Sequence, residues 1–274
     1  MLIPTLVGAF ALFWLGRAVA RRIATRRAWL LASAAGALLA APGLLFVLYY
    51  AHLFDSALSF YRFRSLPMTE LAACGLGFPA GLAQAHRLGG PAGLFGWPAV
   101  LLALVLIPFI KPILDPLAID HERASRDEGI VLQSTMSTCG PASAATLLNV
   151  LGHPASEQEL ARESFTSRGG TENWYLARAL RRRGLDVAFE LRPTVDGVLP
   201  SVIPDDIPSL AIAGVLLPGR AGHFIAILGS DGDSVTFADP IDGKHTMTRA
   251  QLLERYHFTG FFMVVRRPVR PATG

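Results

Sequence analysis

Charged residues are scarce in this chain of 274 residues: they make up 17% of the sequence, against 51% hydrophobic residues. That composition is too apolar for an ordinary soluble enzyme and predicts membrane-spanning segments. Cysteine is much rarer still: only Cys74 and Cys139 occur, so the sequence holds neither a disulfide framework nor a CxxC metal pattern. The seven histidines have no HxxxH or HxH spacing. A metal site is therefore not expected, and no cofactor is needed.

The charges that do occur are divided unevenly along the chain. Residues 1–114 carry a net charge of +7 and residues 115–274 a net charge of −3. The positive excess lies beside apolar runs, where it orients membrane spans, so it gives no reason to expect a nucleic-acid partner. We expect a transmembrane region at 1–114, a linker at 115–130, a soluble domain at 131–268 and a tail at 269–274.

Apolar runs in the first half predict an N-terminal bundle of three or four transmembrane helices. A bilayer core of about 30 Å needs about 20 apolar residues, and three runs approach this length: residues 1–16, 29–51 and 92–110. Residues 71–85 are apolar but short, and form either a short span or a re-entrant helix. The arginine-rich segment between the first two runs should stay in the cytoplasm. Four spans, which we favour, place the soluble domain outside the cytoplasm of a bacterial inner or plasma membrane; three place it inside.

The soluble half opens with a loop of small residues that ends at Cys139. A helix is predicted from Pro141 to Leu151, because proline suits the first helical turn. Cys139 would then lie at a helix N-terminus, where the positive end of the helix dipole favours a thiolate. Gln133, six residues upstream, can donate its side-chain amide to an oxyanion beside the Cys139 N–H. A free cysteine alone is more often a small buried residue than a nucleophile, so a suitable histidine must be found.

His223 offers such a base, because it begins a predicted strand that turns and returns to Asp239. A three-residue hairpin loop ending at Gly232 is a common type, and it would pair Gly229 with Asp233, Ile227 with Val235, Ile225 with Phe237, and His223 with Asp239. Cross-strand partners have Cβ atoms about 5 Å apart, so the carboxylate could hold the imidazole and stabilise the imidazolium. The alternative is a structural His–Asp contact at a sheet edge, without catalysis.

The remaining elements follow an α+β order, with helices first and strands later. Capping boxes predict helices that begin after Ser156 and after Thr248, and a third helix should run from Thr171 to Arg183. The arginines at its end, 181–183, are interpreted as a solvated helix terminus. Strands are expected at residues 186–191, 210–217, 224–228, 234–238 and 261–265.

These motifs together resemble the C39 cysteine peptidases, over about residues 130–268. The resemblance lies in the order of Gln133, then Cys139-Gly140-Pro141-Ala142 at a helix start, then Gly222-His223-Phe224 on a strand, then Asp239-Pro240. It implies a papain-like domain in which helices pack on an antiparallel sheet. It also implies a role for each residue: nucleophile for Cys139, base for His223, orienting acid for Asp239 and oxyanion donor for Gln133.

Two features depart from that family. Thr138 stands where the family often has an aspartate, and no GxxxxGK[ST] motif marks the ATP-binding domain of the peptide-exporting transporters that carry these peptidases. The resemblance implies a cysteine peptidase that acts on a peptide or protein substrate. The predicted transmembrane region would anchor this peptidase to a membrane. A double-glycine leader peptide is the family's substrate, and a separate transporter would be a partner. The alternatives are a peptide-binding or export-accessory module that does not cleave, and an acyltransferase or deamidase using the same thioester chemistry.

Overall fold

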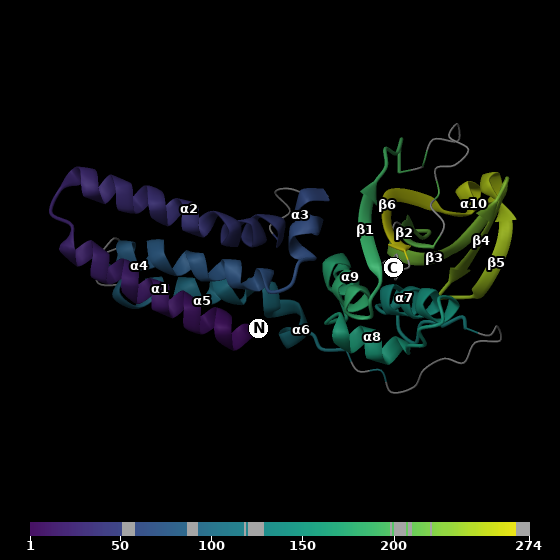
Figure 1. Cartoon of the computed structure of the whole chain (residues 1–274), viewed down its shortest axis with the longest axis horizontal. Helices are drawn as coiled ribbons and strands as arrows, with labels where there is room; N and C mark the ends of the chain where they lie inside the picture. Colours follow the sequence, from purple (N-terminus) through teal and green to yellow (C-terminus); the bar gives the residue numbers. More distant parts are fainter. Residues whose placement is uncertain are drawn as a thin grey trace, which may run out of the picture. The chain divides into compact units, whose positions relative to one another are not determined.

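The computed structural model describes residues 1–50, 58–86, 93–117, 119, 129–197, 199, 207, 210–219 and 221–266. The chain forms two compact units (Figure 1). Unit 1 contains Met1–Ala57 and Met68–Leu114, and unit 2 contains Leu58–Pro67 and Asp115–Gly274. The short segment Leu58–Pro67 therefore belongs to the same unit as the C-terminal half of the chain. The expected tail and most of the expected linker, residues 118 and 120–128, lie outside the described residues.

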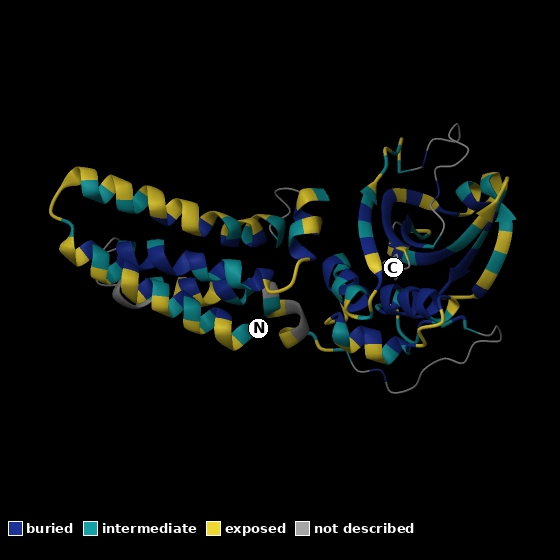
Figure 2. Ribbon diagram, viewed as in Figure 1, coloured by how far each residue is buried: buried dark blue, intermediate teal, exposed yellow. Residues whose placement is uncertain are grey.

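Unit 1 consists of two long helices and several shorter elements. The long helices are α1 (Leu2–Arg22) and α2 (Arg26–Tyr50); the others are η1 (Thr69–Leu76), α4 (Gly77–Ala85), α5 (Gly93–Leu106), η3 (Ile107–Phe109) and α6 (Ile110–Leu114). Within the described residues, α1 and α2 are the two helices long and apolar enough to cross a membrane, rather than three or four. Ile3, Leu31 and Leu38 are 74%, 73% and 77% exposed on them (Figure 2). Such apolar outer faces suit contact with lipid.

The two shorter apolar runs are not single long helices. Residues 71–85 divide between the 3₁₀ helix η1 and the α-helix α4. The run 92–110 changes from α5 to a 3₁₀ turn, η3, which has proline in its first turn. Glycine and proline explain both breaks, because glycine weakens an α-helix and proline cannot donate the i→i−4 hydrogen bond.

Unit 2 is an α+β structure, as the sequence predicts. Its six-stranded sheet has the order β1-β6-β2-β3-β4-β5, and every neighbouring pair is antiparallel. The strands are β1 (Asp186–Leu191), β2 (Ala211–Leu216), β3 (Gly222–Asp231), β4 (Ser234–Asp239), β5 (Gly243–Thr248) and β6 (His257–Arg266). The bounds of β1 are those predicted, whereas β5 was not predicted. β5 lies at the sheet edge and is largely polar, so it has little of the apolar alternation that marks a strand.

In the part of unit 2 that the structure describes, five helices accompany the sheet: α3 (Leu58–Arg64), α7 (Cys139–Val150), α8 (Glu157–Glu163), α9 (Asn173–Arg182) and α10 (Arg249–Arg255). Both predicted capping boxes are confirmed, at Ser156 before α8 and at Thr248 before α10. Helix α7 is almost entirely buried (Figure 2). It approaches β3 closely because its residues are small, and the Ser143 hydroxyl donates to the Phe224 carbonyl oxygen at 3.1 Å. The helix that carries Cys139 is therefore fixed against the strand that carries His223.

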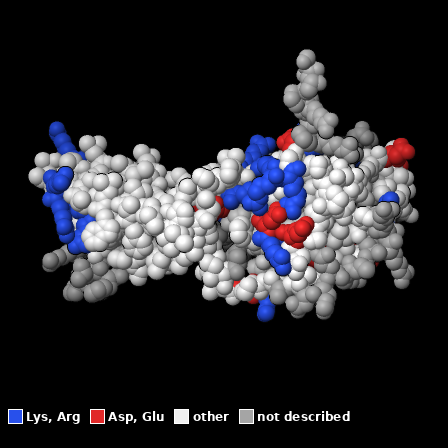
Figure 3. All heavy atoms as spheres, turned by 60° about the horizontal axis from the view of Figure 1, so that its bottom comes forward, with Lys and Arg blue, Asp and Glu red and all other residues white. Residues whose placement is uncertain are grey.

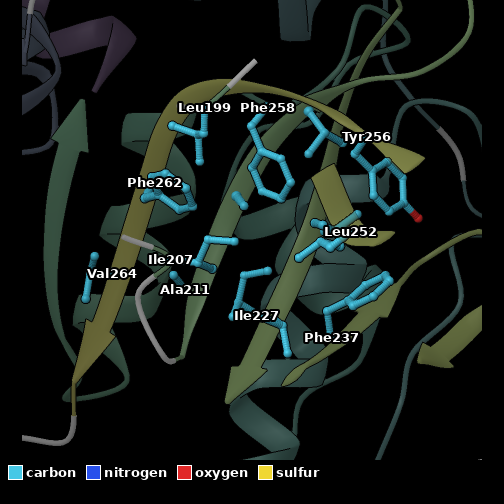
Figure 4. Close-up of a cluster of buried hydrophobic side chains, with 14 residues drawn as sticks. Leu199, Ile207, Ala211, Ile227, Phe237, Leu252, Tyr256, Phe258, Phe262 and Val264 are labelled. Carbon is cyan, nitrogen blue, oxygen red and sulfur yellow. The ribbon is translucent and has the colours of Figure 1, made fainter. Parts of the chain in front are cut away.

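A hydrophobic cluster of side chains from β2, β3, β4, β6 and α10 forms the core on one face of the sheet (Figure 4). Ile225, Ile227 and Phe237 are fully buried in it. Tyr256 packs its ring against Phe237, with centroids 5.8 Å apart, and its hydroxyl points away from the cluster (Figure 4). This core holds the ends of β3 and β4 in place.

The β3–β4 hairpin differs from the predicted register by two residues at Ile227 and by three residues at Gly229. Strand β3 continues to Asp231, which pairs with Ser234, so the turn has two residues rather than three. Gly232 opens this turn with a φ of +55°, as two-residue hairpin turns require. Ile227 consequently pairs with Phe237, not with Val235, and the register shifts once between Ile227 and Gly229. Because side chains alternate with a period of two, the shift of two residues keeps Ile227 and Phe237 on their predicted face.

Candidate active site

His223 and Asp239 meet at one end of the β3–β4 hairpin. His223 Nε2 lies 2.9 Å from Asp239 Oδ1, and the two residues are only 4% and 2% exposed. The observed register makes them diagonal neighbours rather than direct partners, and their side chains still reach each other. The predicted contact between His223 and Asp239 is therefore confirmed, although the predicted strand register is wrong.

The Asp239 carboxylate accepts two further hydrogen bonds. The Ile241 N–H donates to Oδ1 at 2.9 Å, and the Tyr256 hydroxyl donates to Oδ2. Burial acts to raise the pKa of Asp239, but the hydrogen bonds from His223, Tyr256 and Ile241 lower it below its usual value. Asp239 is therefore ionised at neutral pH and fixed on three sides.

Cys139 is the first residue of α7, after the N-cap Thr138, and it lies close enough to His223 to raise the pKa of that imidazole. Burial acts to lower the pKa of His223, but its hydrogen bonds and charge interactions with Asp239 and Cys139 raise that pKa to about 9. The imidazole is therefore protonated at neutral pH. Because Nε2 faces Asp239, Nδ1 is the ring nitrogen left for the sulfur. The Cys139 sulfur and the Asp239 carboxylate thus both interact with the His223 ring.

Gln133 lies in the loop that precedes α7 and is 5% exposed. Its backbone N–H donates to the Pro240 carbonyl oxygen at 2.8 Å, which ties the loop to the residue after Asp239. Its side-chain Nε2 donates to the Thr135 carbonyl oxygen at 2.9 Å. The structure therefore anchors Gln133 beside the His223–Asp239 pair, and here its amide is bonded within its own loop.

Two residues that support the site were missed from the sequence. Glu157, fully buried at the start of α8, accepts hydrogen bonds from the Ser134 N–H at 2.8 Å and the Ser134 hydroxyl at 2.5 Å. It thereby holds the loop of Gln133 in shape. Tyr256 lies 17 residues after Asp239. No sequence pattern links Glu157 to Ser134 or Tyr256 to Asp239. The first contact depends on where α8 begins and the second on where α10 ends.

Comparison with known proteins identifies the family of this half of the chain. The sequence profile of the Peptidase C39 family matches residues 127–269. An uncharacterized protein of Methanothermobacter thermautotrophicus is 36% identical over 145 residues, which cover 52% of this chain and 91% of that protein. A second uncharacterized protein, from Methanothermobacter marburgensis, is 34% identical over 141 residues, covering 52% of this chain and 90% of its own.

Two solved structures are similar to the same part of the chain. The peptidase domain of Streptococcus ComA, a bi-functional ABC transporter involved in quorum sensing, is 20% identical with a TM-score of 0.41, covering 52% of this chain and 99% of that domain. A double-glycine-motif protease from an AMS/PCAT transporter, solved with its leader peptide, is 18% identical with a TM-score of 0.41, covering 54% and 99%. Since the family profile spans more than half of the sequence, the chain belongs to the peptidase C39 family.

Proposed function

We propose that this protein is a membrane-anchored cysteine peptidase in which Cys139, His223 and Asp239 form the catalytic triad and Gln133 supplies an oxyanion donor. The observation that carries the proposal is that Cys139, at the N-terminus of α7, and the buried Asp239 carboxylate both interact with the ring of His223. Helices α1 and α2 are the membrane anchor.

In the proposed reaction, the Cys139 thiolate attacks the carbonyl carbon of the scissile peptide bond, and a C–S bond forms. The negative charge that develops on the carbonyl oxygen is stabilised by the Cys139 N–H and by Gln133, once its amide exchanges Thr135 for the substrate. His223 gives its proton to the leaving amine as the C–N bond breaks. Water, deprotonated by His223, then hydrolyses the thioester. Asp239 keeps the ring oriented throughout.

A matched pair of cysteine variants tests the nucleophile. Cys139→Ala should abolish cleavage of a peptide library by the detergent-solubilised protein and labelling by a thiol-directed active-site probe at neutral pH. Cys74→Ala is the control, because Cys74 lies in unit 1 and its sulfur donates to the Thr5 carbonyl oxygen. Full turnover in Cys139→Ala would end the assignment of Cys139.

Gln133→Ala tests the oxyanion donor. The loss of one such donor raises the barrier by about 3–4 kcal/mol, or about 10²–10³-fold in kcat. We expect weak but measurable turnover with the acyl-enzyme still formed. A variant as active as the parent would remove Gln133 from the proposed mechanism.

The choice of peptides separates the peptidase from its alternatives. Leader peptides ending in double glycine belong in the first library, because the family resemblance points to them. Transfer of the acyl group to an added amine in preference to water would identify an acyltransferase. Binding of peptide without cleavage, and without labelling of Cys139, would identify the non-cleaving module.

A further inference from the structure

Helix α3, which follows α2 in the chain, is part of the catalytic unit. The Tyr61 ring packs on Trp174, Phe189 and Phe261, with centroid distances of 6.2, 5.9 and 5.7 Å. Phe60 meets Trp174 edge to face at 5.6 Å. Phe60 and Tyr61 are 4% and 8% exposed, so these contacts bury both rings. Trp174 belongs to α9, Phe189 to β1 and Phe261 to β6 (Figure 1).

Hydrogen bonds and charge fix the end of α3 in the same way. The Arg64 side chain is 1% exposed, and its guanidinium lies 5.1 Å from the Trp174 ring centroid and donates to the Tyr175 hydroxyl at 3.2 Å. Arg181 donates to the Ser65 carbonyl oxygen at 3.0 Å. The expectation that Arg181 is solvated is therefore wrong. Residues 58–67 must lie on the same side of any membrane as the rest of unit 2.

Within unit 1, η1 and α4 run the length of the helix pair α1–α2. At one end, Cys74 Sγ in η1 donates to the carbonyl oxygen of Thr5, near the start of α1. At the other end, the ring of His86, just after α4, lies 3.9 Å from the ring of Trp29, near the start of α2. The segment formed by η1 and α4 therefore runs from the first turn of α1 to the connection between α1 and α2. We call this connection, Arg21–Arg27, the arginine loop.

The backbones in this region touch, as they do where helices pack in membranes. A Cβ atom added at any of four glycines would lie within about 2 Å of a carbonyl oxygen on the facing helix; these glycines are Gly16, Gly75, Gly77 and Gly81. The 3₁₀ segment also adds length: the 8 residues of η1 rise about 16 Å and the 9 residues of α4 about 14 Å. Together they match the bilayer core of about 30 Å.

The chain then returns to unit 2. After α5, η3 and α6, Asp115 accepts a hydrogen bond from the Arg168 N–H at 3.2 Å, and Pro116 forms an isolated β-bridge with Ser167. A chain that leaves unit 2 at Pro67 and re-enters it at Asp115 crosses a membrane an even number of times between them. One crossing is η1–α4, so the segment from α5 to α6 is the crossing back.

We propose that residues 68–114 form a two-crossing hairpin and that the catalytic unit lies on the opposite side of the membrane from the arginine loop, outside the cytoplasm. Lys and Arg side chains of unit 1 gather at the arginine-loop end in Figure 3, and Arg21, Arg22, Arg26 and Arg27 are exposed there. Short loops rich in arginine remain in the cytoplasm. Helix α2, with 25 residues, then carries the chain across to α3.

This inference rests on the membrane anchoring in the proposed function, and it narrows the substrate class. The site would meet peptides that have already left the cytoplasm, so a secretion step must supply its substrate. Peptides that exist only in the cytoplasm are excluded.

Single cysteines in the full chain test this arrangement. In a Cys74→Ala, Cys139→Ser background, one cysteine is placed at an exposed position: Ala24 in the arginine loop, Leu66 after α3, or Ser230 in β3. Intact bacterial cells are treated with a membrane-impermeant maleimide before and after permeabilisation. We expect Leu66→Cys and Ser230→Cys to be labelled in intact cells, and Ala24→Cys only after permeabilisation.

Every other pattern overturns the proposal. Labelling of Ala24→Cys alone in intact cells would place the catalytic unit in the cytoplasm, and different results for Leu66→Cys and Ser230→Cys would separate α3 from unit 2. Recovery of the protein in the soluble fraction after carbonate extraction would refute the membrane anchor. Cleavage of an added peptide by intact cells is scored separately with the parent chain. If the labelling pattern is as expected but the added peptide is not cleaved, the proposed membrane arrangement stands and only the peptidase function is refuted.

Discussion

Tyr256→Phe removes a single hydroxyl from the innermost end of the proposed triad and keeps the ring that packs on Phe237. That hydroxyl donates to Asp239 Oδ2, and Tyr256 is 2% exposed. Burial and the neighbouring Asp239 carboxylate raise the pKa of Tyr256, so the hydroxyl remains a donor over the working pH range. The variant therefore isolates one buried hydrogen bond to a carboxylate.

The expected cost follows from the bonds that remain. A hydrogen bond to a charged group contributes about 1.5–3 kcal/mol. His223 and the Ile241 N–H still bind Asp239, so we expect a loss near the lower end, about 1.5–2 kcal/mol. This is about a 10–30-fold rise in the unfolding equilibrium constant.

The same change should move the acid limb of the pH profile. The folded-state pKa of Asp239 is depressed, so its contribution to stability is present above its unfolded pKa of about 3.9 and is lost as the pH falls through the folded value. Without the Tyr256 hydroxyl the folded pKa rises. The acid limbs of kcat/KM and of the free energy of unfolding should therefore both shift to higher pH.

Tyr175→Phe is the matched control for this experiment. Tyr175 is 5% exposed and its hydroxyl accepts from Arg64 at 3.2 Å, far along the chain from Asp239. Urea unfolding and peptide cleavage are measured for both variants from about pH 3 to about pH 7, a range that includes the unfolded pKa of Asp239. We expect both to lose stability and only Tyr256→Phe to shift the acid limb. An unshifted limb in Tyr256→Phe would refute the role given to its hydroxyl.

Three further predictions concern other buried groups. The pKa of His223 is raised to about 9, so its stabilisation should be complete below pH about 6.5 and be lost, up to about 3 kcal/mol, as the pH rises through 9; urea unfolding of His223→Asn should lack this loss. Glu157→Gln should destabilise the loop of Gln133 by about 1–3 kcal/mol and lower kcat more than it raises KM. The control is Glu163→Gln, at the partly exposed end of α8, which should leave both parameters unchanged. Equal kinetics in the two variants would show that the loop does not depend on Glu157. Arg64→Ala should cost about 2 kcal/mol through its desolvated ring contacts, whereas Arg62→Ala, exposed on the same helix, should leave Tm unchanged.

Local signals in the sequence predicted the elements they govern. Proline at the start of α7 and the capping boxes before α8 and α10 act within one helical turn, so they could be read without tertiary structure. The alternation of apolar residues in β3 and β4 fixed which face each side chain takes. It could not distinguish registers two residues apart, because both bury Ile225, Ile227 and Phe237.

Features that depend on distant partners were out of reach. The sequence placed the aromatic residues of α3 in the transmembrane region at 1–114, because their partners lie more than a hundred residues later in α9, β1 and β6. The crossing that we propose for η1 and α4 was ambiguous in the sequence as well, because their 17 residues are short for a span unless part of the segment is a 3₁₀ helix. The supporting roles of Tyr256 and Glu157 are of the same kind.

The place of α3 in the chain has a consequence for biogenesis. Arg64 is synthesised 111 residues before Tyr175, its hydrogen-bond partner. In the interval the ribosome makes the whole segment 68–114, so Trp174, on which Phe60 and Tyr61 pack, is made only after that segment is complete. Unit 2 can therefore complete its packing only in chains that already contain the proposed hairpin, so the order of synthesis makes the proposed membrane anchor before the proposed catalytic unit can fold.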